Sequence, residues 1–481
     1  MLTIEWLEKS TIRDLQNAMF EGNLSSEKLV KFYLNQIATH NPHINAVLEV
    51  NPDALFVAAG LDRERQKTGS RSLLHGIPIL LKDNINTGDH LHTSAGSAAL
   101  ACSYGKKDAF LVKKLREAGA IILGKTNMTE WANFMSDSMP NGFSSRGGQV
   151  LNPYGPGTLD VGGSSSGSAA AVACHFSPAA IGTETNGSIL SPASSNAAVG
   201  LKPTVGSVSR KGIIPISFSQ DTAGPITRNV TDAAILLGIM SGSDPEDPVT
   251  HGITVYHDYT PYLLKPLFAE FRIGIVRKGY YDQMHPEEQK LMEIAISELE
   301  FIGCTFTEVD EITPHQNELE NDFQVLLHEF KPALNSYLAN ETKNSSGMTL
   351  DTVINYYKQN PQLIKYGQER LVEANEKNGL LSDPIYISSR LRDLEDGKSA
   401  LDQLFEKGVD ALLFAGCYGS TIPAKAGYPS ITVPAGATSN GKPFGITFTS
   451  KAFNEPQLIK LAYGYEQQTQ LRKLPERFSL V

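Results

Sequence analysis

Short apolar runs that alternate with amphipathic segments constrain the fold of this chain more than any other feature. The run IPILL at residues 77–81 ends at Lys82, and the run AIIL at 120–123 leads to Lys125. Between them, residues 108–119 place apolar side chains at helical spacing. Strands that are apolar at nearly every position are buried on both faces. The pattern therefore predicts an α/β fold, with a mixed β-sheet core sandwiched between layers of α-helices.

The same alternation returns late in the chain, so we expect one domain, residues 1–481, with a discontinuous core. Apolar and charged residues make up 41% and 20% of the chain, as in ordinary globular proteins. We divide the domain into a helical N-terminal part (1–70), a core with functional loops (73–250), a helical cover or insertion (310–408), and returning core strands with a C-terminal helix (409–481).

The composition argues against several kinds of partner and compartment. The net charge of −10 gives no electrostatic reason to bind nucleic acid or an anionic membrane. The four cysteines show neither C-x-x-C spacing nor a disulfide framework, which fits a reducing compartment. The N-terminus lacks the apolar stretch of a signal peptide, and no run reaches the ~18 apolar residues of a membrane span. We expect a cytoplasmic monomer, extracytoplasmic only if a signal peptide has been removed.

A first cluster of small residues, VGGSSSGSAAAVA, occupies residues 161–173. Its Gly163–Gly167 stretch satisfies G-x-S-x-G, the nucleophile elbow of α/β-hydrolases, with Ser165 as nucleophile. That motif needs an apolar strand directly before it and a histidine late in the chain, but GPGTLDV precedes it and the last histidine is His328. The glycine spacing of phosphate-binding loops is also missing. We reject both interpretations.

A second cluster of small residues, AAIGTETNGSILSPASSNAAVGLKPT, follows at residues 179–204. Its apolar start predicts a strand that leads into Thr185, Asn186, Gly187 and Ser188 and then into a helix. Glycine and asparagine tolerate unusual backbone angles, so consecutive N–H groups can turn toward one point. An oxyanion hole requires that geometry.

Together these clusters and their neighbours resemble the amidase signature family. The stretches that carry the resemblance are PILLKDNI, GKTNMTEWANF, RGGQ, VGGSSSGSAAAVA, GTETNGSI, VGLKPTVGSVSRKGIIPISFSQDTAGPITR and AGYPSITVPAG. They occur in the family's order and cover nearly the whole chain. Among members of the family, the chain is most similar to bacterial peptide amidases.

The resemblance implies a Ser-cisSer-Lys triad and an oxyanion hole made of backbone N–H groups. Ser188 corresponds to the nucleophile, Ser164 to the bridging serine that follows a cis peptide bond, and Lys82 to the lysine. The N–H groups of Thr185, Asn186, Gly187 and Ser188 correspond to the oxyanion donors. Asn186 stands where the family's T-G-G-S-I pattern has its first glycine, so it could perturb the turn or contact the substrate.

Physical chemistry supports the same three residues. A serine hydroxyl needs a base to take its proton, and a lysine is a base only when it is neutral. Lys82 follows IPILL, so burial should lower the pKa of its amine. Asp83 and Asp221 are candidate acceptors that support the site. Each residue alone also fits an ordinary structural role, such as a helix cap, a turn or a strand-end lysine.

These inferences predict an enzyme that hydrolyses a carboxamide to a carboxylate and ammonia through an acyl-enzyme. The resemblance favours the C-terminal amide of peptides, or amino acid amides, as substrate and implies no cofactor. His90 and His92 lack a third ligand, so we expect no metal. The alternatives are the ammonia-producing subunit of a tRNA-dependent amidotransferase and a catalytically silent binding scaffold. Residues 130–150 and 316–400 lie outside the repeating pattern and are expected to determine specificity.

Overall fold

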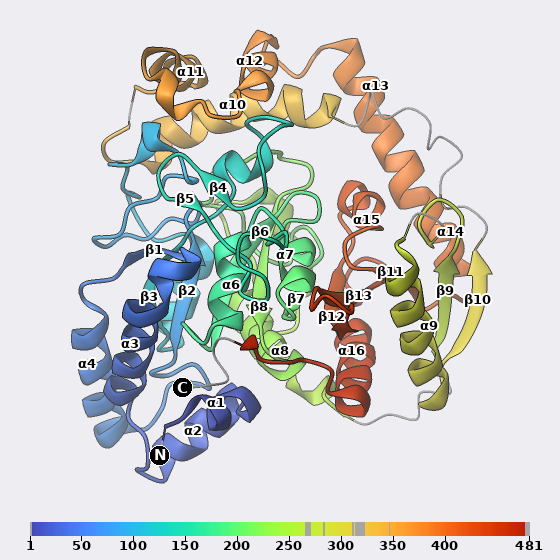
Figure 1. Cartoon of the computed structure of the whole chain (residues 1–481). Coiled ribbons are helices and arrows are strands. Elements are labelled where there is room, and N and C mark those ends of the chain that lie inside the picture. Colours follow the sequence, from blue (N-terminus) through green and yellow to red (C-terminus); the bar gives the residue numbers. More distant parts are fainter. Residues whose placement is uncertain are drawn as a thin grey trace.

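An eleven-stranded sheet forms the centre of the fold, and a two-stranded hairpin accompanies it (Figure 1). The computed structural model describes residues 2–264, 271–281, 284–309, 312, 323–345 and 347–476. Its strands are β1 (Val47–Val50), β2 (Pro78–Lys82), β3 (Ile121–Thr126), β4 (Phe143–Ser144), β5 (Gly148–Gln149), β6 (Ala179–Glu184), β7 (Val199–Lys202), β8 (Thr222–Thr227), β9 (Arg272–Val276), β10 (Thr305–Val309), β11 (Ala411–Ala415), β12 (Ser430–Ala437) and β13 (Pro443–Thr449). The large sheet has the order β1-β3-β2-β6-β8-β7-β12-β13-β11-β9-β10.

The sheet is mixed, which confirms the predicted fold class. Strand β2 runs parallel to both of its neighbours, β3 and β6. From β6 to β11 each adjacent pair is antiparallel, and β11, β9 and β10 are parallel again. All residues of β2, β3 and β6 are buried, as their apolar sequences require. Apart from the β4–β5 hairpin, the strands between residues 47 and 449 thus share one sheet; the segment boundaries proposed above stay predictions.

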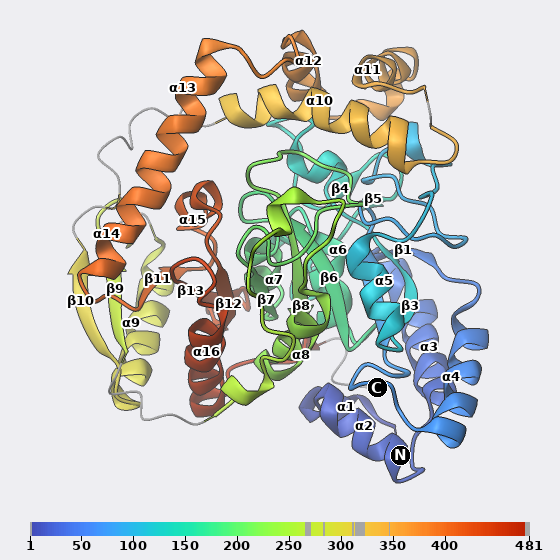
Figure 2. The ribbon, with the colours of Figure 1, turned by 180° about the vertical axis from the view of Figure 1, so that it is seen from behind.

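Helices cover both faces of this sheet. They are α1 (Ile4–Lys9), α2 (Ile12–Phe20), α3 (Ser26–Ile44), α4 (Ala54–Thr68), α5 (Phe110–Glu117), α6 (Ser166–Ala173), α7 (Leu190–Ser195), α8 (Val230–Met240), α9 (Pro286–Phe301), α10 (Gln324–Glu341), α11 (Leu350–Gln359), α12 (Glu369–Glu376), α13 (Pro384–Asp393), α14 (Ala400–Glu406), α15 (Thr421–Ala426) and α16 (Glu455–Thr469). In Figure 1 α6 and α7 face the viewer, whereas in Figure 2 α5 and α8 do. Every helix in the described ranges is too short or too polar to traverse a bilayer.

The N-terminal part departs from the helical prediction at one place. Residues Val47–Val50 form the edge strand β1, which pairs antiparallel with β3. A four-residue strand is too short to show a period of two in the sequence, so flanking helical patterns conceal it. The helices α3 and α5 agree more closely with the sequence-based prediction. Ser25 caps α3 by accepting a hydrogen bond from the Lys28 N–H, and Gly119 follows α5 with a positive φ of 88°.

Helices α10–α14, here called the helical cover, arch over one end of the sheet and reach its β9–β10 edge (Figures 1 and 2). Helices α10, α11 and α12 of this cover build a hydrophobic core against loops of the central part, and Tyr386 of α13 packs against it. Phe330 of α10 contacts the rings of Trp131 and Phe134, and Ile216 belongs to the same core. The predicted start of this region, residues 310–322, lies almost entirely outside the described residues. The cover therefore packs on loops that, as shown below, line the candidate site.

Candidate active site

Lys82 ends the buried strand β2, and its side chain is completely buried. Its Nζ donates hydrogen bonds to Ser164 Oγ, at 2.8 Å, and to the carbonyl oxygen of Thr183, at 3.1 Å. The first bond joins two of the residues that the sequence singles out, although 82 positions separate them. Because β2 lies beside β6 in the sheet, the lysine reaches the Thr183 carbonyl of the neighbouring strand.

The serines at 164–168 have different partners, and these partners identify the one that can take part in catalysis. Ser165 and Ser168 donate their hydroxyls to carbonyls of β6, and Ser166 donates to a carbonyl one turn earlier. Ser164 alone among them contacts Lys82. The peptide bond between Gly163 and Ser164 is cis, as the resemblance implies. Ser165, the serine of the rejected hydrolase motif, is committed to a structural bond.

Ser188 lies in the turn that leads from β6 to α7, next to the serine cluster. Its carbonyl oxygen accepts a hydrogen bond from the Ser165 N–H at 3.1 Å. Its side chain is 7% exposed. The hydrogen bonds of the described residues do not include one between the Ser164 and Ser188 hydroxyls. The structure thus joins Lys82 to Ser164 directly and brings Ser188 beside them through the backbone.

The turn from Thr185 to Ser188 has the properties of an anion-binding site. The hydrogen bonds found among the described residues leave the backbone N–H groups of Thr185, Asn186, Gly187 and Ser188 without acceptors. Gly187 has a φ of +74°, in the left-handed region that glycine adopts without strain. Unpaired N–H groups on consecutive residues of such a turn attract a negative oxygen.

Asn186, the departure from the family pattern, ties this turn to the start of α15. Its side-chain oxygen accepts a hydrogen bond from Ser420 Oγ at 2.8 Å, and its Nδ2 donates to Thr421 Oγ1 at 3.1 Å. The asparagine therefore fastens the turn to a segment 234 positions away. The sequence suggested that Asn186 could perturb the turn or contact the substrate. These contacts fasten the turn, and a contact with the substrate stays a prediction because Asn186 also lines the cavity described below.

Burial dominates the electrostatics of the candidate triad. It lowers the pKa of Lys82 from 10.5 to about 7, although the nearby carboxylates of Glu184 and Asp221 act in the opposite direction. Burial also raises the pKa of Asp221 to about 6, against the hydrogen bonds that it accepts. A lysine with this pKa is partly neutral at neutral pH and can act as a base. The direction agrees with the sequence-based expectation.

The two candidate supporting acids occupy different surroundings. Asp221 accepts hydrogen bonds from Thr185 Oγ1, at 2.5 Å, and from the Ile216 N–H, at 2.8 Å, so it supports the turn. Asp83 is buried elsewhere, where Arg146 and the Gly96 N–H bind its carboxylate. It therefore organises a neighbouring loop and does not hydrogen-bond to the triad residues.

Sequence reasoning missed Glu184, the last residue of β6. One oxygen of its buried carboxylate accepts hydrogen bonds from the N–H groups of Ile189, at 2.7 Å, and Leu190, at 3.1 Å, at the start of α7. It thereby fixes the helix that begins directly after Ser188. An acidic residue shortly before a predicted helix is a recognisable signal for this role.

A cavity of about 230 Å³ opens beside the turn. Ser188, Thr185 and Asn186 line it together with residues from four other regions, namely Ala132, Asn133, Phe134, Ile216, Gln220, Phe323, Leu326, Thr421 and Lys425. Both segments expected to determine specificity contribute to its wall. The loop 216–220 and the α15 region contribute as well, and no pattern in the sequence indicates that role.

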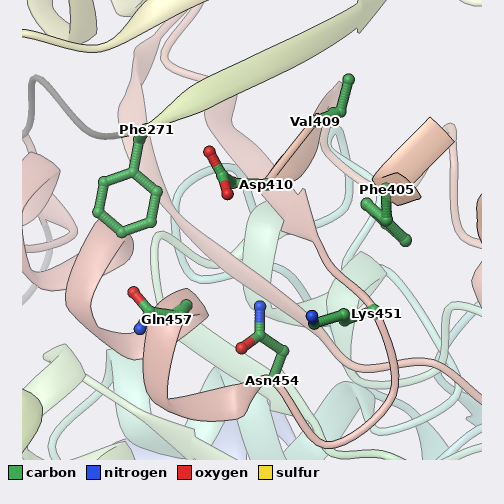
Figure 3. Close-up of a pocket in the computed structure, with 7 residues that line it drawn as sticks. All are labelled: Phe271, Phe405, Val409, Asp410, Lys451, Asn454 and Gln457. Carbon is green, nitrogen blue, oxygen red and sulfur yellow. The ribbon is translucent and has the colours of Figure 1, made fainter. Parts of the chain in front are cut away.

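A larger recess of about 350 Å³ lies elsewhere, between the start of β9 and the start of α16 (Figure 3). Phe271, Asp410 and Lys451 are among its lining residues, but no residue of the candidate triad is. This recess is the larger of the two, but the smaller cavity is the one lined by the candidate nucleophile, Ser188. Within the described ranges, no group of three or more His, Cys, Asp or Glu side chains could hold a metal ion. His90 and His92 pair with Asp53 and Glu49 instead.

Comparisons with known proteins agree with this fold. The profile of the Amidase family matches residues 28–422. An Arabidopsis thaliana protein named as a probable amidase is 40% identical over 98% of this chain and 92% of its own length. The crystal structure of the native peptide amidase from Stenotrophomonas maltophilia has a TM-score of 0.90 and 42% identity, with 97% of this chain and 98% of that chain covered. One of the subunits of the glutamyl-tRNA(Gln) amidotransferase from Thermosynechococcus vestitus is 33% identical over 96% of this chain and 98% of its own length.

The chain belongs to the amidase signature family. It is an amidohydrolase, an enzyme that hydrolyses amides.

Proposed function

We propose that this enzyme hydrolyses a primary carboxamide to a carboxylate and ammonia, with Ser188 as nucleophile, Ser164 as proton relay and Lys82 as base. The observation that carries the proposal is the hydrogen bond of 2.8 Å between the buried Lys82 amine and Ser164 Oγ, with Ser188 held beside this pair. A buried lysine bonded to a serine next to a second serine is an arrangement suited to proton transfer.

In the first half of the reaction, Ser188 Oγ attacks the carbonyl carbon of the substrate. Its proton passes to Ser164 Oγ, and the Ser164 proton passes to the neutral Lys82 amine, which becomes an ammonium ion. The carbonyl oxygen becomes an oxyanion, which the free N–H groups of the turn at residues 185–188 stabilise. Hydrogen bonds between catalytic groups commonly tighten only when substrate binds, so the mechanism does not require a bond between the Ser164 and Ser188 hydroxyls in the free enzyme.

In the second half, the tetrahedral intermediate collapses and the carbon–nitrogen bond breaks. Lys82 returns a proton through Ser164 to the departing nitrogen, which leaves as ammonia. Water then attacks the ester formed with Ser188, and the same relay accepts the proton of that water and returns one to Ser188. The lysine ends neutral, ready for the next turnover.

The substrate proposed here is the C-terminal amide of a peptide, or an amino acid amide. The similarity to the Stenotrophomonas maltophilia peptide amidase supports it. So does the cavity, whose wall includes the apolar side chains of Phe134, Ile216 and Leu326. Lys425 is the one charged residue that the described part of the chain contributes to this wall, and Asp393 pairs with it at 3.1 Å. A neutral acyl group with an apolar side chain fits these surroundings better than free glutamine, which carries two charges.

Ammonia release from a panel of amides tests the proposal. The panel contains amidated di- and tripeptides, free amino acid amides and glutamine, each incubated with the purified chain alone. We expect hydrolysis of the peptide amides, with KM lowest for apolar C-terminal residues. Hydrolysis of glutamine alone would instead favour the ammonia-producing subunit of an amidotransferase, which the similarity to the Thermosynechococcus vestitus protein keeps as the second candidate. Size exclusion would test the proposed monomer in the same preparation.

A further inference from the structure

Gln220 lines the cavity next to Ser188, but the mechanism above gives it no role. Its side chain is 3% exposed, and its buried Oε1 accepts no hydrogen bond from any described residue. A buried amide oxygen without a donor destabilises the free enzyme. Because this oxygen belongs to a residue of the cavity wall, an N–H group of a bound substrate can satisfy it.

The loop that carries Gln220 is held in place from two sides. On one side, Asp221 accepts the Ile216 and Ser217 N–H groups and bonds to Thr185 of the oxyanion turn. On the other side, the buried Glu329 of α10 accepts hydrogen bonds from the Ser217 hydroxyl, at 2.5 Å, and from the Ser219 N–H, at 3.0 Å. The loop is therefore rigid without substrate, and a fixed acceptor recognises a donor at little entropic cost.

The position of the cavity indicates which N–H of the substrate Gln220 meets. Ser164 and Lys82, which return the proton to the departing nitrogen, do not line this cavity. In the proposed mechanism the departing nitrogen faces the relay, so we expect the acyl part of the substrate to enter the cavity among Phe134, Ile216 and Leu326. An acceptor in this wall faces a donor on the acyl part, not the nitrogen that leaves.

We propose that Gln220 accepts a hydrogen bond from the N–H on the α-carbon of the substrate's acyl group. This proposal rests on the proposed function and narrows its substrate class. The preferred substrate is then an N-acylated amino acid amide, as at the C-terminus of an amidated peptide, with an apolar side chain in the cavity. A carboxamide that lacks this N–H binds the same apolar wall but leaves the Gln220 oxygen unpaired.

Two matched substrates test the proposal. One is N-acetyl-leucinamide, and the other is its analogue in which an ester oxygen replaces the acetamido N–H. We expect wild-type kcat/KM, measured as ammonia release, to favour the N–H substrate by about tenfold, the usual effect of one buried unpaired acceptor. In Gln220→Met the ratio should fall to about one, because the acceptor is gone. Gln220→Glu keeps an acceptor and should keep a preference for the N–H substrate.

Gln368 supplies a matched control. It is a buried glutamine whose Oε1 also lacks a donor among the described residues, but it does not line the cavity. Gln368→Met should therefore keep the wild-type ratio. Circular dichroism and thermal melting confirm that each variant is folded.

An unchanged ratio in folded Gln220→Met, or an equal loss for both substrates, would overturn the role of Gln220 and leave the proposed function intact. If the wild-type enzyme hydrolyses neither these substrates nor any other carboxamide, both proposals fail.

Discussion

In the proposed mechanism, the pKa of Lys82 sets the pH at which the enzyme becomes active. Only the neutral amine accepts a proton from Ser164, so kcat/KM should rise with pH along an acidic limb. Burial lowers this pKa to about 7. At pH 5, about two pH units lower, about one amine in a hundred is neutral. We therefore expect kcat/KM to be about 100-fold lower at pH 5 than its plateau near pH 9, with the midpoint at about pH 7.

Replacement of Lys82 by Met separates catalysis from stability. Activity should fall by several orders of magnitude, because no base remains. Stability should respond differently: relative to wild type, the variant should lose stability as the pH rises. Below pH 7 the wild-type lysine is protonated in both the folded and the unfolded state, so the folded state bears the whole cost of a buried charge. Between pH 7 and 10.5 the unfolded state binds more protons, so wild-type stability rises with pH.

The size of this effect follows from the two pKa values, about 7 when folded and 10.5 when unfolded. The difference corresponds to about 5 kcal/mol as an upper bound. Lys82→Met leaves Ser164 Oγ and the Thr183 carbonyl without this donor, which costs about 1–3 kcal/mol each. The variant also lacks the titrating amine, so it does not share the rise in wild-type stability with pH. Relative to wild type, it should lose about 4 kcal/mol of unfolding free energy between about pH 6 and pH 10.

Kinetics from about pH 5 to 9 and denaturant unfolding at about pH 6 and 10 provide the assays. Lys202→Met is the matched control, because Lys202 is equally buried, has a pKa lowered to about 8 by burial, and bonds to the Tyr428 carbonyl outside the candidate triad. It should change stability in the same direction but keep the acidic limb. A flat wild-type profile, or wild-type turnover in Lys82→Met, would refute the reasoning.

Substitutions in the turn, in its supports and at one control glycine give further expected outcomes. Asp221→Asn removes a negative charge that raises the pKa of the base, so the acidic limb should move to lower pH; a limb that moves up would contradict this electrostatic effect. Gly187→Ala adds a Cβ 3.1 Å from Ser420 Oγ at a φ of +74°, and should lower kcat by up to ~10²–10³-fold, the range for one lost oxyanion donor, with KM little changed. Gly157→Ala is the control, because Gly157 has a φ of +78° with open space around it; this variant should lose only stability, about 1–2 kcal/mol by urea unfolding. Equal kcat losses in Gly187→Ala and Gly157→Ala would argue against a role of the turn in oxyanion binding. Asn186→Ala and Thr421→Val each break the same hydrogen bond, so kinetics of the double variant should show less than the sum of the two single losses. Additive losses would mean that this bond does not hold the turn.

Features that depend on a short segment, or on motifs in a fixed order along the chain, can be predicted from this sequence. Strand β2 and the lysine at its end follow from an apolar run of five residues, and Ser164, Gly187 and Ser188 follow from motifs whose order identifies the family. The fall in the pKa of Lys82 also follows, because a strand buried on both faces buries its last side chain.

The sequence does not predict contacts that depend on how distant segments pack. The bonds of Asn186 to the α15 region and of Asp221 to Thr185 join residues that no periodicity relates. Asp83 is adjacent to Lys82 in the chain, but it lies just beyond the end of β2 and its carboxylate binds Arg146. The packing of the helical cover likewise determines the wall of the cavity. Leu326 of α10 lines the cavity, and so does Phe323, the residue directly before α10.

Covalent labelling measures whether Lys82 activates Ser188 through Ser164. The wild-type enzyme, Ser164→Ala and Lys82→Met would each be incubated with a fluorophosphonate, and the adduct would be located and timed by mass spectrometry of peptides. We expect one adduct, on Ser188, which forms rapidly in the wild type and orders of magnitude more slowly in both variants. An adduct on another residue, or wild-type labelling rates in Lys82→Met, would rule out activation of Ser188 by this lysine.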